Sequence, residues 1–275
     1  MLAVIIEKRA IPVYWQFLEK RGASNLAEQQ ALLRPIFKLL KQYEMVVLGD
    51  REFPSVELAK WLKQRKVYFV LRQKKDTNIQ KKGQDYQELS SLGLAPGMKL
   101  FLTGIKVTQS QGFGGANIGG YWPRKYRGKV EKEPWYLLTN FDNLEEAIKA
   151  DKKRVGIEAM FKDCKTGGYN LEGSKASSER LTFLVLLIAI AYTSSTLKGK
   201  LIKVKRQEKY IGRLRKIKQC LTKNSNFWIG LYGDLWMIRR EFVREWVEEY
   251  MRVNLNKLPF DQRGLKAMNI IQQAL

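Results

Sequence analysis

The amino-acid sequence predicts a mixed α/β fold with a basic, helical C-terminal region. Three observations support this fold class. Apolar runs typical of strands alternate with segments of helical period up to residue 73, a Gly- and Lys-rich segment with short strand-like pieces follows, and the end of the chain is helical in pattern. We therefore expect the first part of an α/β core over residues 1–73, a β-rich insertion over 74–140, the end of the core over 141–197 and a basic helical region over 198–275.

The first elements are two strands and a helix. Leu2–Ile6 and Ile11–Phe17 are β-rich runs with a polar break between them. Ser24 or Asn25 can cap the helix, and Glu28 completes a capping-box pattern with Asn25. Apolar residues then recur at helical spacing: Leu26, Leu32, Leu33, Ile36, Phe37 and Leu40.

A buried strand that ends on an acid comes next. Met45–Leu48 is apolar and is followed almost at once by Asp50. This pattern is typical of enzymes that present a metal-binding carboxylate at the C-terminal edge of a sheet. Ser55 is expected to cap a short helix, and Val67–Leu71 is the next predicted strand. The order of strands and helices indicates one α/β sheet.

The insertion is expected to be mostly β. Its strand-like pieces are Leu100–Ile105 and Trp135–Thr139, on either side of the Gly-rich stretch Gly112–Gly120. The segment that follows the glycines mixes aromatic and basic residues, a composition suited to base stacking and phosphate contact. Its basic members are Arg124, Lys125 and Arg127. An exposed hairpin without any such role is an equally good interpretation.

The rest of the chain is expected to be helical. Asn143 caps one helix, and a second helical stretch ends at Gly167-Gly168. Ser177 or Ser178 caps an apolar helix containing Leu181–Tyr192, which is too short to span a bilayer and is expected to be buried. Trp228–Leu275 has a helical pattern.

Composition restricts the function. The formal net charge is +23, from 50 basic and 27 acidic residues, which indicates a polyanionic partner such as nucleic acid. The chain has no histidine, so His-based metal sites and Ser–His nucleophiles are excluded. A metal site would have to be rich in oxygen, which favours Mg²⁺ or Mn²⁺. The two cysteines form no metal spacing or disulfide framework, and no signal peptide is evident, so we expect a cytoplasmic protein.

Two carboxylates are the candidate metal ligands. Asp50 lies at the end of its strand, and Glu158 lies on the second helical stretch beside the sheet. Arg154 and Lys165 share the helix face of Glu158, where they could neutralise DNA phosphates. Such Arg–Glu pairs are also common on solvated helix faces, so spacing alone leaves a structural role open.

At these residues the chain resembles the DDE transposases of bacterial insertion sequences. It is most similar to the IS-four-type group, relatives of the Tn-five transposase, which carries a Tyr-(2)-Arg-(3)-Glu-(6)-Lys signature. The resemblance covers roughly residues 1 to 195 and is carried by these segments: Arg9–Trp15, Ser24–Gln30, Leu48–Phe53, Ile157–Lys165 and Gly168–Glu172.

The resemblance implies an RNase H-like sheet with a β-rich insertion before the helix of the catalytic Glu. It implies Asp50 and Glu158 as catalytic, Mg²⁺- or Mn²⁺-binding carboxylates, and Arg154 and Lys165 as contacts to the transposon end. It also implies double-stranded DNA as partner, at the ends of the insertion sequence and at the target. A homodimer assembled on DNA and association with the nucleoid are further expectations, with no small-molecule cofactor and no membrane.

Two departures from the family pattern affect the expected activity. Asp151 stands at the Tyr position of the signature, where an acid would lose the aromatic contact and is expected to repel phosphate. No Asp precedes Asp50, and Glu7 is a weak substitute for the first carboxylate. We therefore expect an N-terminally truncated transposase, with little strand transfer by this chain alone.

Two other functions remain open. The chain could be a remnant that binds DNA, or inhibits a full-length transposase, without chemistry. Alternatively, the basic residues of Lys198–Lys223 interleave with apolar ones and could lie on a membrane surface, although a helix packed on the core with a basic outer side fits them better.

Overall fold

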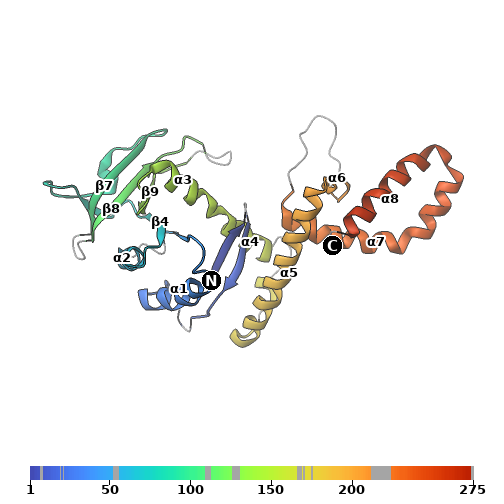
Figure 1. The fold of residues 1–275 in the computed structure, drawn as a ribbon, viewed down its shortest axis with the longest axis horizontal. Coiled ribbons are helices and arrows are strands. Elements are labelled where there is room, and N and C mark those ends of the chain that lie inside the picture. The colour runs from blue at the N-terminus through green and yellow to red at the C-terminus, as the bar shows by residue number, and fades with distance from the viewer. Residues whose placement is uncertain are drawn as a thin grey trace. The chain divides into compact units, whose positions relative to one another are not determined.

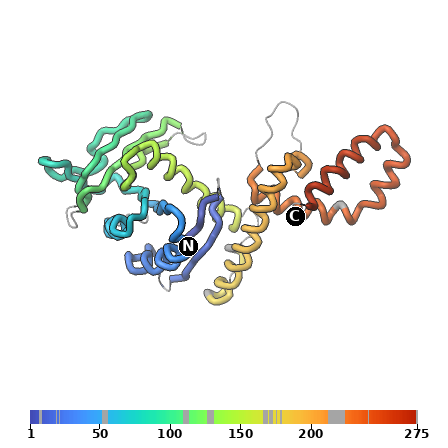
Figure 2. The backbone as a smooth tube through the Cα atoms, viewed as in Figure 1, coloured from blue at the N-terminus to red at the C-terminus, as the bar shows by residue number. Residues whose placement is uncertain are grey.

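The computed structural model describes residues 1–6, 9–18, 20, 22–51, 56–108, 113–125, 131–165, 169, 171–174, 176–211 and 224–273. It forms two compact units, Met1–Ala159 and Met160–Leu275 (Figures 1 and 2). Several residues singled out in the sequence lie outside the described residues: Glu7, Ser55, Gly112, Arg127, Gly167, Gly168 and the segment 212–223, which contains Cys220, one of the two cysteines.

A seven-stranded mixed sheet is the centre of the first unit, in the order β3-β4-β9-β8-β7-β5-β6. Only β3 and β4 are parallel, and the other pairs are antiparallel. The strands are β3 (Val46–Gly49), β4 (Tyr68–Gln73), β5 (Asn78–Gln80), β6 (Tyr86–Glu88), β7 (Lys99–Val107), β8 (Phe113–Tyr121) and β9 (Trp135–Thr139). The predicted mixed α/β class is confirmed, and the strands of residues 74–140 continue the same sheet as β3 and β4.

The first two strands differ from expectation. β1 (Leu2–Ile6) and β2 (Arg9–Tyr14) form their own antiparallel two-stranded sheet. Within the described residues neither strand pairs with the seven-stranded sheet, so the expectation of one sheet was wrong here. A β-rich run predicts a strand but not its partner, because the partner depends on contacts distant in sequence.

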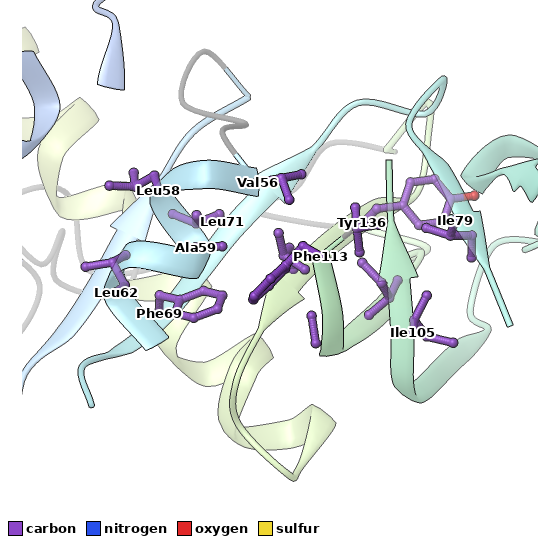
Figure 3. Packing of buried hydrophobic residues seen from close by; sticks show 14 of the residues in the cluster. Val56, Leu58, Ala59, Leu62, Phe69, Leu71, Ile79, Ile105, Phe113 and Tyr136 are labelled. Atoms are coloured by element: carbon purple, nitrogen blue, oxygen red, sulfur yellow. The ribbon is translucent and has the colours of Figure 1, made fainter. Parts of the chain in front are cut away.

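Helices cover both faces of the large sheet. On one face, α1 (Leu26–Leu39) and α2 (Val56–Gln64) contribute Leu33 and Leu62 to the main core. Figure 3 shows how α2 lies over β4, with Phe69 among its neighbours. On the other face, α3 (Leu144–Lys153) buries Ala147 and Ile148 against alternate residues of β4 and β9. Because side chains alternate along β4, its residues contribute to two separate cores, one on each face of the sheet.

Local signals explain where these helices begin. Asn25 caps α1 and forms the predicted capping box with Glu28: each residue's backbone N–H donates to the other's side chain, at 2.9 and 2.8 Å. Asn143 caps α3, as predicted, by accepting the Glu145 N–H at 2.7 Å. The start of α3 packs closely on β8, because a Cβ at Gly119 would lie 2.7 Å from the Leu144 Cδ1.

Helix α4 (Val155–Lys165) follows α3 after a break at Arg154, and the two units divide within it. The second unit contains the helices α5 (Ser178–Val204), α6 (Glu208–Ile211), α7 (Asn226–Val253) and α8 (Leu258–Gln272). Its core includes Ile202, Ile229 and Ile271. The expected domain division at 197/198 falls inside α5.

Two glycines bring α5 and α7 into backbone contact. A Cβ at Gly199 would lie 1.8 Å from the Asn226 carbonyl oxygen, and a Cβ at Gly230 would lie 1.8 Å from the Ser195 carbonyl oxygen. No side chain fits at either distance, so glycine is required at both positions for this packing.

Helix α5 corrects one prediction. It has 27 residues and extends well beyond the expected apolar segment. Val185 and Tyr192 are buried, but Phe183, Leu187 and Ile190 are 60% or more exposed in the structure, so the segment is not buried on all sides. By length and composition, α5 is the one described helix that could cross a membrane. This is weak evidence for a membrane span, because the core helices of soluble proteins meet the same criteria.

Candidate active site at the sheet edge

Four strand ends meet at one edge of the large sheet. β3 ends at Gly49, directly before Asp50, and runs parallel to β4, which ends at Gln73. β9 begins at Trp135 beside the end of β4, and β8 ends opposite it at Tyr121. Residues far apart in sequence therefore lie together here, at the carboxyl ends of parallel strands where ligands of open α/β sheets bind.

Arg154 joins the two candidate carboxylates. Its Nη1 lies 3.1 Å from the Asp50 Oδ2, and its Nη2 lies 3.0 Å from the Glu158 Oε1. The Asp50 Oδ1 accepts the Arg51 backbone N–H at 2.7 Å. Arg154 is the residue at the break between α3 and α4, so its side chain can reach the end of β3 while Glu158 follows one turn later. The structure thus brings Asp50, Arg154 and Glu158 into one cluster.

A buried ion pair lies close to this cluster. The Arg72 Nε and Nη2 donate to the two carboxylate oxygens of Asp151 at 2.9 and 2.7 Å. The guanidinium lies 4.2 Å from the ring centre of Trp135, a cation–π distance. Burial would lower the pKa of Arg72, but the hydrogen bond and charge of Asp151, with the charges of Asp50 and Glu158, outweigh burial and raise it. Arg72 is therefore a permanent cation close to both candidate ligands.

The expectation that Asp151 repels phosphate was wrong. Its side chain is 1% exposed and is held by the fork of Arg72, so its charge is already neutralised and faces away from solvent. An acid that repels phosphate would have to be exposed and unpaired. Position 151 contributes to the packing of α3 on the sheet.

Asp50 and Glu158 fit a divalent cation in part. Both supply carboxylate oxygens, about half of each side chain is exposed, and one guanidinium reaches both. Hard oxygen donors are what Mg²⁺ and Mn²⁺ prefer. Within the part of the chain that the structure describes, no group of three or more acidic or cysteine side chains is placed to hold an ion. The described residues thus offer two ligands.

The basic candidates are placed unequally. Arg124 and Lys125 are exposed and follow Tyr121 at the same sheet edge as Asp50. Arg127 lies outside the described residues. Lys165 is exposed at the end of α4, two helical turns after Glu158, in the portion of this helix that belongs to the second unit.

Sequence reasoning missed Arg72. A signal was present, because Arg72 follows the apolar run of β4 just as Asp50 follows that of β3. Parallel neighbours end at the same edge, so a charged residue after each run indicates a shared site. A second ion pair, between Arg51 and Glu133, joins the segments after β3 and before β9, and the Arg51 hydrogen bond lowers the pKa of Glu133.

Comparison with known proteins identifies the family of this chain. Residues 7–194, well over half of the chain, match the family model described as the transposase DDE domain. A search of curated proteins finds no match. The matched stretch contains Asp50, Arg72, Arg154 and Glu158 together with the mixed sheet that positions them. The chain belongs to the transposase DDE domain family.

Proposed function

We propose that this chain carries the catalytic region of a transposase that cuts and joins DNA at the ends of an insertion sequence. Membership of the family implies an enzyme that cleaves and transfers DNA, and these enzymes generally depend on a divalent metal. One observation carries the proposal: the guanidinium of Arg154 binds both Asp50 and Glu158 at the edge of the sheet. Asp50 is 104 residues from Arg154 in the sequence, and Glu158 is four residues from it.

Asp50 and Glu158 would hold Mg²⁺ or Mn²⁺. When bound, such a cation activates the attacking water or hydroxyl and stabilises the leaving oxygen of a phosphodiester. The Arg51 backbone N–H orients the Asp50 carboxylate by its hydrogen bond, leaving one oxygen directed at Arg154. The buried Arg72–Asp151 pair fixes the end of α3 and therefore the position of Glu158.

Arg124 and Lys125 are proposed DNA contacts, with Arg127, Arg154 and Lys165. The two described basic residues after β8 are exposed at the edge that carries the carboxylates, and the net charge of +23 favours duplex DNA as partner. The Tyr-Arg-Glu-Lys signature of the IS-four-type group, a homodimer assembled on DNA, a cytoplasmic location and the four-part division of the chain belong to the same proposal.

A test measures Mn²⁺-dependent nicking of supercoiled plasmid. We expect the nicking by this chain alone to be weak, because only two ligands are placed among the described residues. It should be lost in Asp50→Asn and Glu158→Gln, whereas Glu146→Gln, which changes an exposed acid on α3, should retain it. Nicking that persists in both site variants would refute the assignment of these carboxylates.

A second candidate is a DNA-binding protein without chemistry. It is favoured by the presence of only two placed carboxylates among the described residues. Duplex binding that falls steeply with salt, without nicking in Mn²⁺, would support it. In either case, a double change of Arg124 and Lys125 to Gln should weaken binding for all sequences. It should also make the salt dependence of binding less steep, by about one in the logarithmic slope for each phosphate that the variant no longer neutralises.

A further inference from the structure

Arg154 takes a position that a metal ion would need. Its two terminal nitrogens bind two different acids, Asp50 and Glu158, at 3.1 and 3.0 Å. Its side chain is 11% exposed, whereas those of the two acids are 48% and 53% exposed. The cation is therefore the enclosed member of the cluster, and water or ions can reach the acids from outside.

The pairing of Arg154 differs from that of its neighbour Arg72. Arg72 forms the two-pronged contact with a single carboxylate that is strongest for a guanidinium. Arg154 makes one contact with each acid, and its Nε is buried with no hydrogen-bond acceptor among the described residues. A buried donor without a partner is costly. Arg154 is thus held by the charges of two acids and not by a two-pronged contact with one of them. A new hydrogen-bond acceptor would therefore stabilise its guanidinium.

A divalent ion would compete with Arg154 for these two carboxylates. Mg²⁺ binds oxygens at about 2.1 Å and carries two positive charges. An ion held by Asp50 and Glu158 would therefore draw their negative charge away from Arg154 and place a like charge beside it. The displaced guanidinium would then need an anion, and a DNA phosphate accepts two parallel hydrogen bonds from arginine.

We propose that Arg154 acts as a switch that couples metal binding to DNA binding. Without metal it bridges Asp50 and Glu158 and occupies their oxygens. With metal it is released to a DNA phosphate, so each ligand increases the affinity for the other, as linkage requires. This inference rests on the proposed function, because it needs Asp50 and Glu158 to be metal ligands.

The experiment titrates the full chain with Mn²⁺ alone, by calorimetry or by the electron paramagnetic resonance of free Mn²⁺. The variants are Arg154→Gln, which removes the bridge, and Arg154→Lys, which keeps the charge but lacks a fork that spans two acids. Arg244→Gln is the matched control, because Arg244 makes the same i,i+4 contact with Glu248 at 2.9 Å on α7. Circular dichroism shows whether each variant folds.

We expect Arg154→Gln to bind Mn²⁺ roughly tenfold more tightly than the unchanged chain, since a neighbouring like charge is removed. Arg154→Lys should lie between the two, and Arg244→Gln should match the unchanged chain. Duplex affinity, measured at constant ionic strength with Ca²⁺ or with chelator, should rise with Ca²⁺ in the unchanged chain. In Arg154→Gln this rise should largely disappear.

Two results separate this inference from the proposed function. If Asp50→Asn and Glu158→Gln leave Mn²⁺ affinity unchanged, the metal site itself is wrong. If those variants weaken Mn²⁺ binding but folded Arg154→Gln and Arg154→Lys bind it no more tightly than the unchanged chain, the switch is refuted and the metal site stands. Should Arg154→Gln fail to fold, Arg154→Lys and the Ca²⁺ dependence of DNA binding by the unchanged chain decide the question.

Discussion

The change Asp151→Asn should destabilise the first unit strongly. It keeps the shape of the side chain but removes the charge that balances Arg72. Because the Arg72 and Asp151 side chains are only 11% and 1% exposed, solvent cannot replace the missing partner. Breaking a buried pair in this way typically costs about 3–5 kcal/mol of unfolding free energy. Asp50 and Glu158 also act on Arg72 and compensate in part, so we expect the lower end, about 3 kcal/mol.

The effect can be measured by thermal unfolding. For a domain of this size a loss of about 3 kcal/mol lowers the melting temperature by roughly 6–12 °C. Asp142→Asn, which removes an exposed acid just before α3, should leave it unchanged. The double change Arg72→Met with Asp151→Leu removes both charges, so it should be more stable than Asp151→Asn alone. A melting temperature for Asp151→Asn within about 1 °C of the unchanged chain would refute this reasoning.

Three further changes test other parts of the fold. Gly230→Ala places a Cβ 1.8 Å from the Ser195 carbonyl oxygen, so we expect it to lower the stability by at least about 3 kcal/mol in melting experiments. Gly264→Ala on α8, where the Cβ meets nothing within 4 Å, should be neutral or stabilising. Equal melting temperatures for the two variants would contradict the contact between α5 and α7. Burial raises the pKa of the Cys164 thiol to about 11. At pH 8 the thiolate is then only about a thousandth of the thiol population, so mass spectrometry should find Cys164 alkylated slowly in the native chain and rapidly in denaturant, and equal rates would contradict its burial. Asn25→Ala removes the cap of α1 and should cost about 1 kcal/mol in urea unfolding, while an unchanged midpoint would show that the cap is dispensable.

Local signals in the sequence predicted much of the fold. The capping residues Asn25 and Asn143 begin their helices where the pattern predicted, because a cap needs only residues within the next turn. The strand before Asp50 was also predicted from its neighbours alone, and β9 begins and ends at the expected residues.

Contacts between distant residues could not be predicted in this way. The partner of Asp151 is Arg72, 79 residues away, so an acid that is neutralised in the fold was expected to be exposed. The bridge from Arg154 to Asp50 spans 104 residues and depends on the break between α3 and α4. The pairing of β1 with β2 alone, and the exposed side of α5, likewise depend on which elements meet in space.

Gly119 of β8 lies next to the start of α3, and Arg154 follows the end of that helix. A Cβ at position 119 would lie 2.7 Å from the Leu144 Cδ1, which is the tip of a flexible side chain, so Leu144 can turn away from an alanine without movement of the helix. A larger side chain would instead have to displace the start of α3. Because the helix between Leu144 and Arg154 is about 15 Å long, a tilt of about 10° would move Arg154 by roughly 2.6 Å. The size of the residue at position 119 therefore decides whether a change in β8 stays local or reaches the cluster of Asp50, Arg154 and Glu158.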